Sequence, residues 1–127
     1  MRYSMPEWWS IDIPDRWQVI EHPKCTTFEP PTCKSALSVS VRRKATDVTD
    51  DDLREFAGDA PLTPVELPHL TGFESTSTVR RVFLRELWLR GGQFMLFVTY
   101  ICFLADRGRE DSVVEAMLRS LAVPNAT

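Results

Sequence analysis

The feature that most constrains the fold is the segment "LRELWLRGGQFMLFVTYICFLAD", residues 84–106, in which two glycines separate two apolar runs. The second run is rich in Phe, Val, Ile and Tyr, and it is too short for a membrane-spanning helix, which needs about 20 residues. A glycine pair between such runs is typical of a tight hairpin turn. The segment therefore predicts two paired antiparallel strands.

The pairing of these two strands predicts what each face of the hairpin presents. If the turn is formed by Gly91 and Gly92, Arg90 faces Gln93 and Trp88 faces Met95, and apolar side chains then lie on both faces. A sheet with one face in water would alternate apolar and polar residues cleanly. We therefore expect the hairpin to lie in the centre of a sheet that is covered on both faces.

Two amphipathic segments can provide that cover. In "VTDDDLREFAGDA", residues 48–60, Thr49 can cap a helix, the three aspartates suit its N-terminal end, and Gly58 can end it. In "EDSVVEAMLRSL", residues 110–121, the apolar positions form one helical face. One helix for each face predicts an α/β (α+β) sandwich, an antiparallel β-sheet flanked by helices on both faces.

The remaining segments fit one domain over residues 1–127. The stretches "WWSIDIP", "WQVIEH", "CTTF" and "ALSVSVRR" predict strands, and Pro14 with Asp15 predicts a turn after the first. Three prolines in residues 61–68 predict a loop or surface linker. Arg85 lies among apolar neighbours in mid-strand, and we expect it to pair with a helix carboxylate such as Glu115.

Composition excludes some classes of function. The formal net charge of −3 argues against a general nucleic-acid binder, which needs a basic surface. The local cluster at residues 42–44 is interpreted as edge charges that keep a sheet soluble.

The N-terminal residues show no signal or transit pattern, which predicts a cytoplasmic protein with reduced thiols. Cys25 and Cys33 could approach each other if the segment that contains them is a hairpin.

Catalytic motifs and metal-ligand spacings are absent from the sequence, so we expect no enzyme activity, no cofactor and no metal. The two histidines, His22 and His69, lie beside prolines in turn-like segments and are interpreted as exposed loop residues. The acidic run at residues 50–52 is interpreted as a helix cap rather than a cation site.

One group of residues on the central hairpin is a candidate surface for a protein partner. An aromatic side chain beside an arginine is typical of interface anchors, and the alternative is that the same residues are buried and paired. Trp8, Trp9 and Trp17 leave the same choice open between core filling and an exposed aromatic rim. The candidate partner-binding residues are Trp88, Arg90, Glu86, Gln93 and Met95.

The order of these motifs resembles the PsbP-like superfamily, which includes the photosystem II extrinsic protein, a Ran-binding nuclear-transport factor and DcrB-like small bacterial proteins. The resemblance rests on "SIDIPDRW", on "ALSVSVRR" followed by "VTDDDLREFA", and on "GFESTSTV", the glycine-turn hairpin and the closing "SVVEAMLRSL". It covers nearly the whole chain. It implies an antiparallel sheet flanked by helices and a role in binding other proteins, and it carries no shared catalytic set.

Two hypotheses of function follow. The first is a non-enzymatic protein-binding module of bacterial type, such as a secretion-associated adaptor or chaperone or an immunity-type protein, without nucleic-acid or membrane binding; a homodimer is an alternative use of an uncovered sheet face. The second is a small-ligand binder or an enzyme with a pocket between the 61–68 loop and the sheet. That pocket would use Glu86, His69 or Tyr100.

Overall fold

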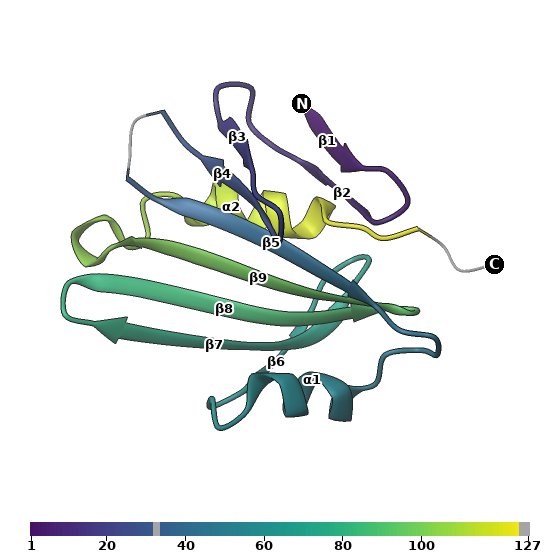
Figure 1. Ribbon diagram of the computed structural model, residues 1–127. Coiled ribbons are helices and arrows are strands. Elements are labelled where there is room, and N and C mark those ends of the chain that lie inside the picture. Colours follow the sequence, from purple (N-terminus) through teal and green to yellow (C-terminus); the bar gives the residue numbers. More distant parts are fainter. Residues whose placement is uncertain (32–33, 125–127) are drawn as a thin grey trace.

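The computed structural model describes residues 1–31 and 34–124, and it is built on a seven-stranded antiparallel sheet (Figure 1). The strand order is β3-β4-β5-β9-β8-β7-β6, so the hairpin β8–β9 lies at the centre, as the sequence predicts. The strands are β3 (Gln18–Glu21), β4 (Thr26–Glu29), β5 (Ala36–Arg43), β6 (Thr63–Glu66), β7 (Thr71–Val79), β8 (Val82–Gly91) and β9 (Phe94–Phe103).

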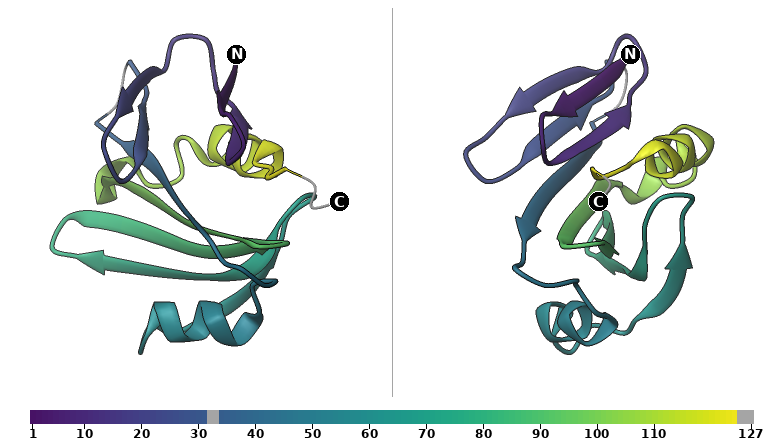
Figure 2. Two further views of the ribbon diagram at one scale, coloured as in Figure 1. Left: turned by 45° about the vertical axis from the view of Figure 1, so that its right-hand side comes forward. Right: turned by 90° about the vertical axis from the view of Figure 1, so that its right-hand side faces the viewer.

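A small hairpin and two helices complete the α+β fold. The hairpin consists of β1 (Arg2–Met5) and β2 (Trp9–Asp12), the helices are α1 (Asp50–Ala57) and α2 (Asp111–Ser120), and a short 3₁₀ turn covers Leu104–Asp106. Helix α1 lies on one side of the sheet, and α2 lies on the other side next to the β1–β2 hairpin (Figure 2). Within the described ranges, no helix is both long enough and apolar enough to cross a membrane.

Two hydrophobic cores lie on opposite faces of the sheet because successive residues of a strand point to opposite sides. The larger core combines Leu87 and Leu89 of β8 with Met117 and Leu118 of α2. The smaller core contains Trp88 of β8, together with Val48, Leu53 and Phe73 at and below α1. The expected cover of both sheet faces by helices is therefore confirmed.

The central hairpin differs from the expected register by two residues. Gly91 pairs with Phe94, and Arg90 pairs with Met95 rather than with Gln93. Gly91 is the last residue of β8, and a Cβ there would come within 2.7 Å of Leu70 and 2.8 Å of Val123. Gly92 makes the turn at φ 57°. A shift of two residues keeps every side chain on its predicted face, so the deduced faces are correct.

Helix α1 begins and ends where its sequence predicts. The Thr49 hydroxyl accepts a hydrogen bond from the Asp52 N–H at 3.2 Å, and the Asp52 carboxylate accepts one from the Thr49 N–H at 2.9 Å. This reciprocal pair is a capping box. Gly58 ends the helix at φ 67°.

Two local expectations need correction, and one is confirmed. Residues 61–68 do not form a loop, because Thr63–Glu66 is the edge strand β6, and Pro64 is tolerated there since an edge strand needs fewer ladder donors. Strand β1 has no counterpart among the strands that the sequence predicts. Arg85 pairs with Glu115 at 3.1 Å, as predicted, and also with Glu74 at 2.7 Å.

Candidate functional site

The second half of β5 has a neighbouring strand on only one side. Strand β4 pairs with Leu37, Ser38 and Val39 and goes no further, whereas β9 pairs with β5 along its full length. The chain leaves the ladder at Cys25, whose carbonyl accepts a hydrogen bond from the His22 N–H at 2.9 Å in the turn between β3 and β4. Residues 40–43 therefore form a strand edge in the middle of the molecule.

The direction of the backbone groups along this edge follows from the ladder. In antiparallel strands, the N–H and C=O of one residue point to the same side, and consecutive residues alternate sides. The Lys44 N–H donates to the Gln93 carbonyl at 2.8 Å, on the β9 side. By alternation, Arg42 and Ser40 also point toward β9. The backbone groups of Val41 and Arg43 point outward.

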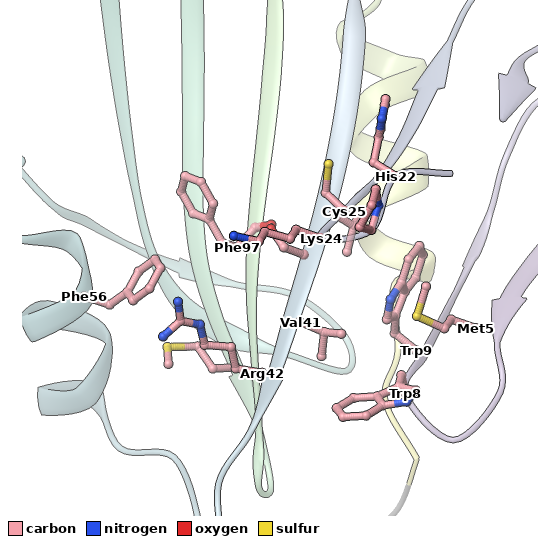
Figure 3. A pocket seen from close by; sticks show the side chains of 14 residues that line it. Met5, Trp8, Trp9, His22, Lys24, Cys25, Val41, Arg42, Phe56 and Phe97 are labelled. Atoms are coloured by element: carbon pink, nitrogen blue, oxygen red, sulfur yellow. The ribbon is translucent and has the colours of Figure 1, made fainter. Parts of the chain in front are cut away.

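A groove of about 590 Å³ follows this edge and is open to solvent (Figure 3). One wall comes from the β1–β2 hairpin and carries Met5, Trp8 and Trp9. The other wall lies on the α1 side and carries Phe56, Met95 and Phe97. The turn between β3 and β4 closes one end with residues 22–25. Figure 3 shows the two aromatic walls on opposite sides of β5.

Exposed aromatic rings stand at the mouth of the groove and rest on buried ones. Trp8 is 37% exposed and packs edge-on against the buried Phe94, with ring centroids 6.0 Å apart. Phe56 is 42% exposed and lies 5.9 Å from Phe97, which in turn packs on Trp88. The core therefore holds the exposed rings in place before any partner binds.

The charge of the groove is positive. The guanidinium of Arg42, which lines the groove, lies 5.1 Å from the centre of the Phe56 ring. The next residue of β5, Arg43, is not part of the lining, and its guanidinium lies 5.5 Å from the centre of the Phe94 ring. Lys24 lines the closed end, and no Asp or Glu is among the described residues that line the groove. Each cation is thus placed against an aromatic face or solvent instead of a carboxylate.

Trp9 contributes an unusual polar group to the hairpin wall. Its side chain is 2% exposed, and its indole Nε1 has no hydrogen-bond acceptor among the described residues. A buried donor without an acceptor destabilises a fold by about 1–3 kcal/mol. The Trp9 ring itself is held by edge-on packing against Phe28 at 6.2 Å.

The structure separates the five residues of the predicted partner surface. Trp88 is only 4% exposed, because α1 packs over it, so the expectation that it is an accessible anchor needs correction. Arg90 pairs with Asp50 of α1 at 2.7 Å, and Gln93 donates to the Ala45 carbonyl at 3.1 Å. Met95 alone of the five lines the groove.

Glu86 lies half-buried on the same sheet face as Trp88, opposite Thr99 of β9. Contact of Glu86, Arg90 and Gln93 with a partner stays a prediction. Of the three tryptophans left open by the sequence, Trp8 is exposed at the groove, and Trp9 and Trp17 are buried.

The residues proposed for a small-ligand pocket do not converge. Glu86 and Tyr100 lie on opposite faces, since Glu86 pairs with Thr99, the residue before Tyr100. The Tyr100 hydroxyl donates a hydrogen bond to the Glu110 carboxylate at 2.6 Å. Burial of the hydroxyl and, to a smaller extent, this carboxylate raise the pKa of Tyr100 above its ordinary range. His69 is exposed beside the edge strand β6. The geometry therefore offers no shared site for these three side chains.

The cysteines give no further site. Burial raises the pKa of the Cys102 thiol, which lies in the larger core. Cys25 lines the groove, and the question of its pairing falls outside the described residues because Cys33 is not among them. No group of three His, Cys, Asp or Glu side chains within residues 1–31 and 34–124 is arranged to hold a metal ion.

Sequence signals for the groove residues were partial. The sequence leaves open whether Trp8 is buried or exposed, and it predicts that Arg42 and Arg43 are charges at a sheet edge. Phe56 gave no separate signal, because an aromatic residue three positions after Leu53 in an amphipathic helix is ordinarily part of the buried face. Its exposure depends on how far α1 covers the sheet.

Comparison with known proteins shows the fold but no sequence family. No protein-family model and no curated protein matches the chain. A protein of Bacteroides thetaiotaomicron of known crystal structure superposes with a TM-score of 0.81 at 14% sequence identity, over 98% of this chain and 48% of that one. The chain therefore spans about half the length of that protein.

LpqN of Mycobacterium tuberculosis, described as involved in cell envelope biogenesis, also has a similar structure. The TM-score is 0.60 at 11% identity, over 98% of this chain and 91% of LpqN. At these identities the likeness establishes a shared α+β architecture. The antiparallel sheet with flanking helices implied by the PsbP-like resemblance is present, while membership of that superfamily stays a prediction.

Proposed function

We propose that this chain is a non-enzymatic protein-binding module of bacterial type, and that the groove along β5 is its contact surface. The observation that carries the proposal is the unpaired edge at residues 40–43 between two walls that each carry one exposed aromatic ring, Trp8 on one side and Phe56 on the other. Aromatic residues and arginine are enriched at protein interfaces. A strand edge is a template for pairing with another chain.

The roles that fit best are those of a secretion-associated adaptor or chaperone, or of an immunity-type protein, acting in the cytoplasm. Each requires a preformed surface that recognises another protein without chemical reaction. The cell-envelope role described for LpqN, whose fold is similar, supports a partner that is exported or resides in the envelope. The division of Glu86, Tyr100 and His69 among separate places supports binding over catalysis.

The test is native mass spectrometry on the tagged chain purified gently from its own host, followed by affinity measurement with the partner so identified. We expect a stoichiometric second protein. Replacing Trp8→Ala together with Phe56→Ala should weaken its binding by about 900-fold, because interface anchors each contribute about 2 kcal/mol, a factor of about 30.

The matched control is Phe103→Ala, which removes an aromatic ring of similar exposure, 47%, outside the groove. This variant should bind as the parent does, and circular dichroism should show that all variants are folded. Equal binding by the groove variant and the parent would contradict the proposal, as would a bare monomer that carries only a small-molecule mass.

A further inference from the structure

We propose that the partner binds through an acidic, extended segment that pairs with residues 40–43 of β5 as an additional strand. The inference rests on the proposed function and goes beyond it in naming both the chemistry of the partner segment and its mode of binding. Strand addition to an exposed sheet edge obtains affinity from backbone hydrogen bonds and specificity from alternating side chains. The groove supplies both elements.

The backbone of the edge is ready to accept a strand. The N–H and C=O groups of Val41 and Arg43 point away from β9, and the ladder with β4 ends at Val39. The open length of residues 40–43 corresponds to about 13 Å of strand at about 3.3 Å per residue. An added segment would lie in line with β4, beyond the turn at His22 and Cys25.

On each face of the sheet, an arginine packed on an aromatic ring lies next to the open edge of β5. On the α1 face, Arg42 lies over the ring of Phe56. On the other face, Arg43 lies over Phe94, which also carries the edge-on contact with Trp8. Because side chains of a strand alternate between faces, an added segment would have an arginine and an aromatic ring beside it on each of its two faces.

The charges of the groove select an acidic segment. Lys24 and Arg42 line the groove, no described Asp or Glu does, and none of these cations or Arg43 forms an ion pair with a described carboxylate. An arriving carboxylate would meet cations held over aromatic faces. Complementary charge of this kind accelerates association and suppresses wrong partners.

The same charges disfavour a second copy of this chain at the edge. A symmetric pair of β5 edges would bring the arginines at 42 and 43 of both copies together, and like charges directly opposite each other are destabilising. A single-stranded nucleic acid could use the arginines and aromatic rings. It has no peptide backbone to pair with Val41 and Arg43, and for this reason the peptide is favoured.

The experiment uses the full ¹⁵N-labelled chain and two synthetic peptides of about seven residues, one alternating valine with glutamate and one alternating valine with lysine. We expect the glutamate peptide to bind at least about tenfold more tightly. Its binding should slow hydrogen exchange at the amides of Val41 and Arg43. The double variant Arg42→Glu, Arg43→Glu should reverse the preference, whereas the control Arg16→Glu, Arg119→Glu, outside the groove, should keep it.

Backbone pairing is tested separately by N-methylation of the glutamate peptide at alternate residues. One set of methyl groups blocks the amides that face β5, and the complementary set blocks only the outer edge. Strand addition predicts that only the set facing β5 abolishes binding. Loss with both sets or with neither would overturn it.

The inference would also be overturned by equal binding of the two peptides, by unchanged exchange at Val41 and Arg43, or by tighter binding of an oligothymidylate than of the glutamate peptide. Its failure is distinguishable from that of the proposed function. A partner whose binding depends on Trp8 and Phe56, but which leaves those two amides unprotected, would uphold the binding module and reject strand addition.

Discussion

Adjacent residues of β5 serve different surfaces because a strand alternates at every position. Val39 is buried in the larger core, while Arg42 and Arg43, on opposite faces, each lie against an aromatic ring. The same alternation places the backbone groups of Val41 at the open edge. A single strand thus stabilises the core at one end and carries the proposed binding surface at the other.

The backbones of β7 and β8 approach each other so closely at position 72 that only glycine fits there. A Cβ on Gly72 would overlap the carbonyl oxygen of Trp88 in the neighbouring strand. We expect Gly72→Ala to lower the free energy of unfolding by about 3 kcal/mol, because a backbone atom cannot move aside without breaking the ladder. Urea unfolding followed by circular dichroism measures this change.

The control for that prediction is Ser77→Ala, an exposed position of the same strand, which should change the free energy of unfolding by less than about 0.5 kcal/mol. Equal stability of Gly72→Ala and the parent would show that β7 and β8 are not packed as closely as described.

At the scale of elements, the stability of helix α1 comes from interactions at its N-terminal end and with the sheet, because the helix is short. It has eight residues, and isolated helices this short are not stable in water. Its capping box, the Lys44–Asp52 ion pair at 2.7 Å and the Arg90–Asp50 ion pair at 2.7 Å fix it on the sheet. The same placement positions Phe56 at the groove.

The stability that Asp52 contributes should depend on pH. The hydrogen bond from Lys44, followed by those from Thr49, lowers the pKa of the Asp52 carboxyl below its ordinary value of 3.8. A lowered folded-state pKa contributes stability that is present above pH 3.8 and is lost as the pH falls through the folded-state pKa. We expect the melting temperature of Asp52→Asn to lie below that of the parent at pH 7 and to converge with it in acid.

Asp51→Asn is the matched control for this measurement, since it removes the same charge from an exposed neighbour whose one ion pair with the described residues is to Arg54, at 3.2 Å. Its difference from the parent should be small at pH 7. A melting-temperature gap for Asp52→Asn that stays constant from pH 7 to below pH 3 would contradict the assigned pKa direction.

At the scale of the whole molecule, the central strands connect the two cores. Leu87 and Leu89 of β8 enter the core under α2, while Trp88 between them enters the core under α1. Because both cores contain side chains of β8, loss of packing in either core also disturbs the strand that contributes to the other. The two faces are expected to unfold as one cooperative unit.

Truncation of one leucine in each core tests this cooperativity. Leu53→Ala and Leu118→Ala both remove a fully buried side chain and should each destabilise the fold by about 3 kcal/mol. In both variants, unfolding curves from tryptophan fluorescence and far-ultraviolet circular dichroism should coincide. A separate early transition in Leu53→Ala would mean that α1 and its core unfold independently.

Much of the fold could be predicted from the sequence because its signals are local. The Thr49 cap, the strand Ala36–Arg43, the apolar face of α2 and the two-sided character of the central hairpin all depend on residues close together in the chain. The predicted register was wrong by two residues because Gly91 pairs with Phe94 inside the ladder, so that the turn is formed by Gly92 and Gln93. Gly91 lies beside Leu70 and Val123, which are distant in sequence.

The sequence by itself determined an α+β sandwich with both sheet faces covered, since hydrophobic periodicity and helix capping act within a few residues. Only the tertiary structure decided which surfaces remain open. The exposure of Trp8 and Phe56 and the burial of Trp88 follow from the reach of α1 and the β1–β2 hairpin, and the free edge of β5 follows from the point where β4 turns away. These are distances between segments far apart in the chain, which no local pattern encodes.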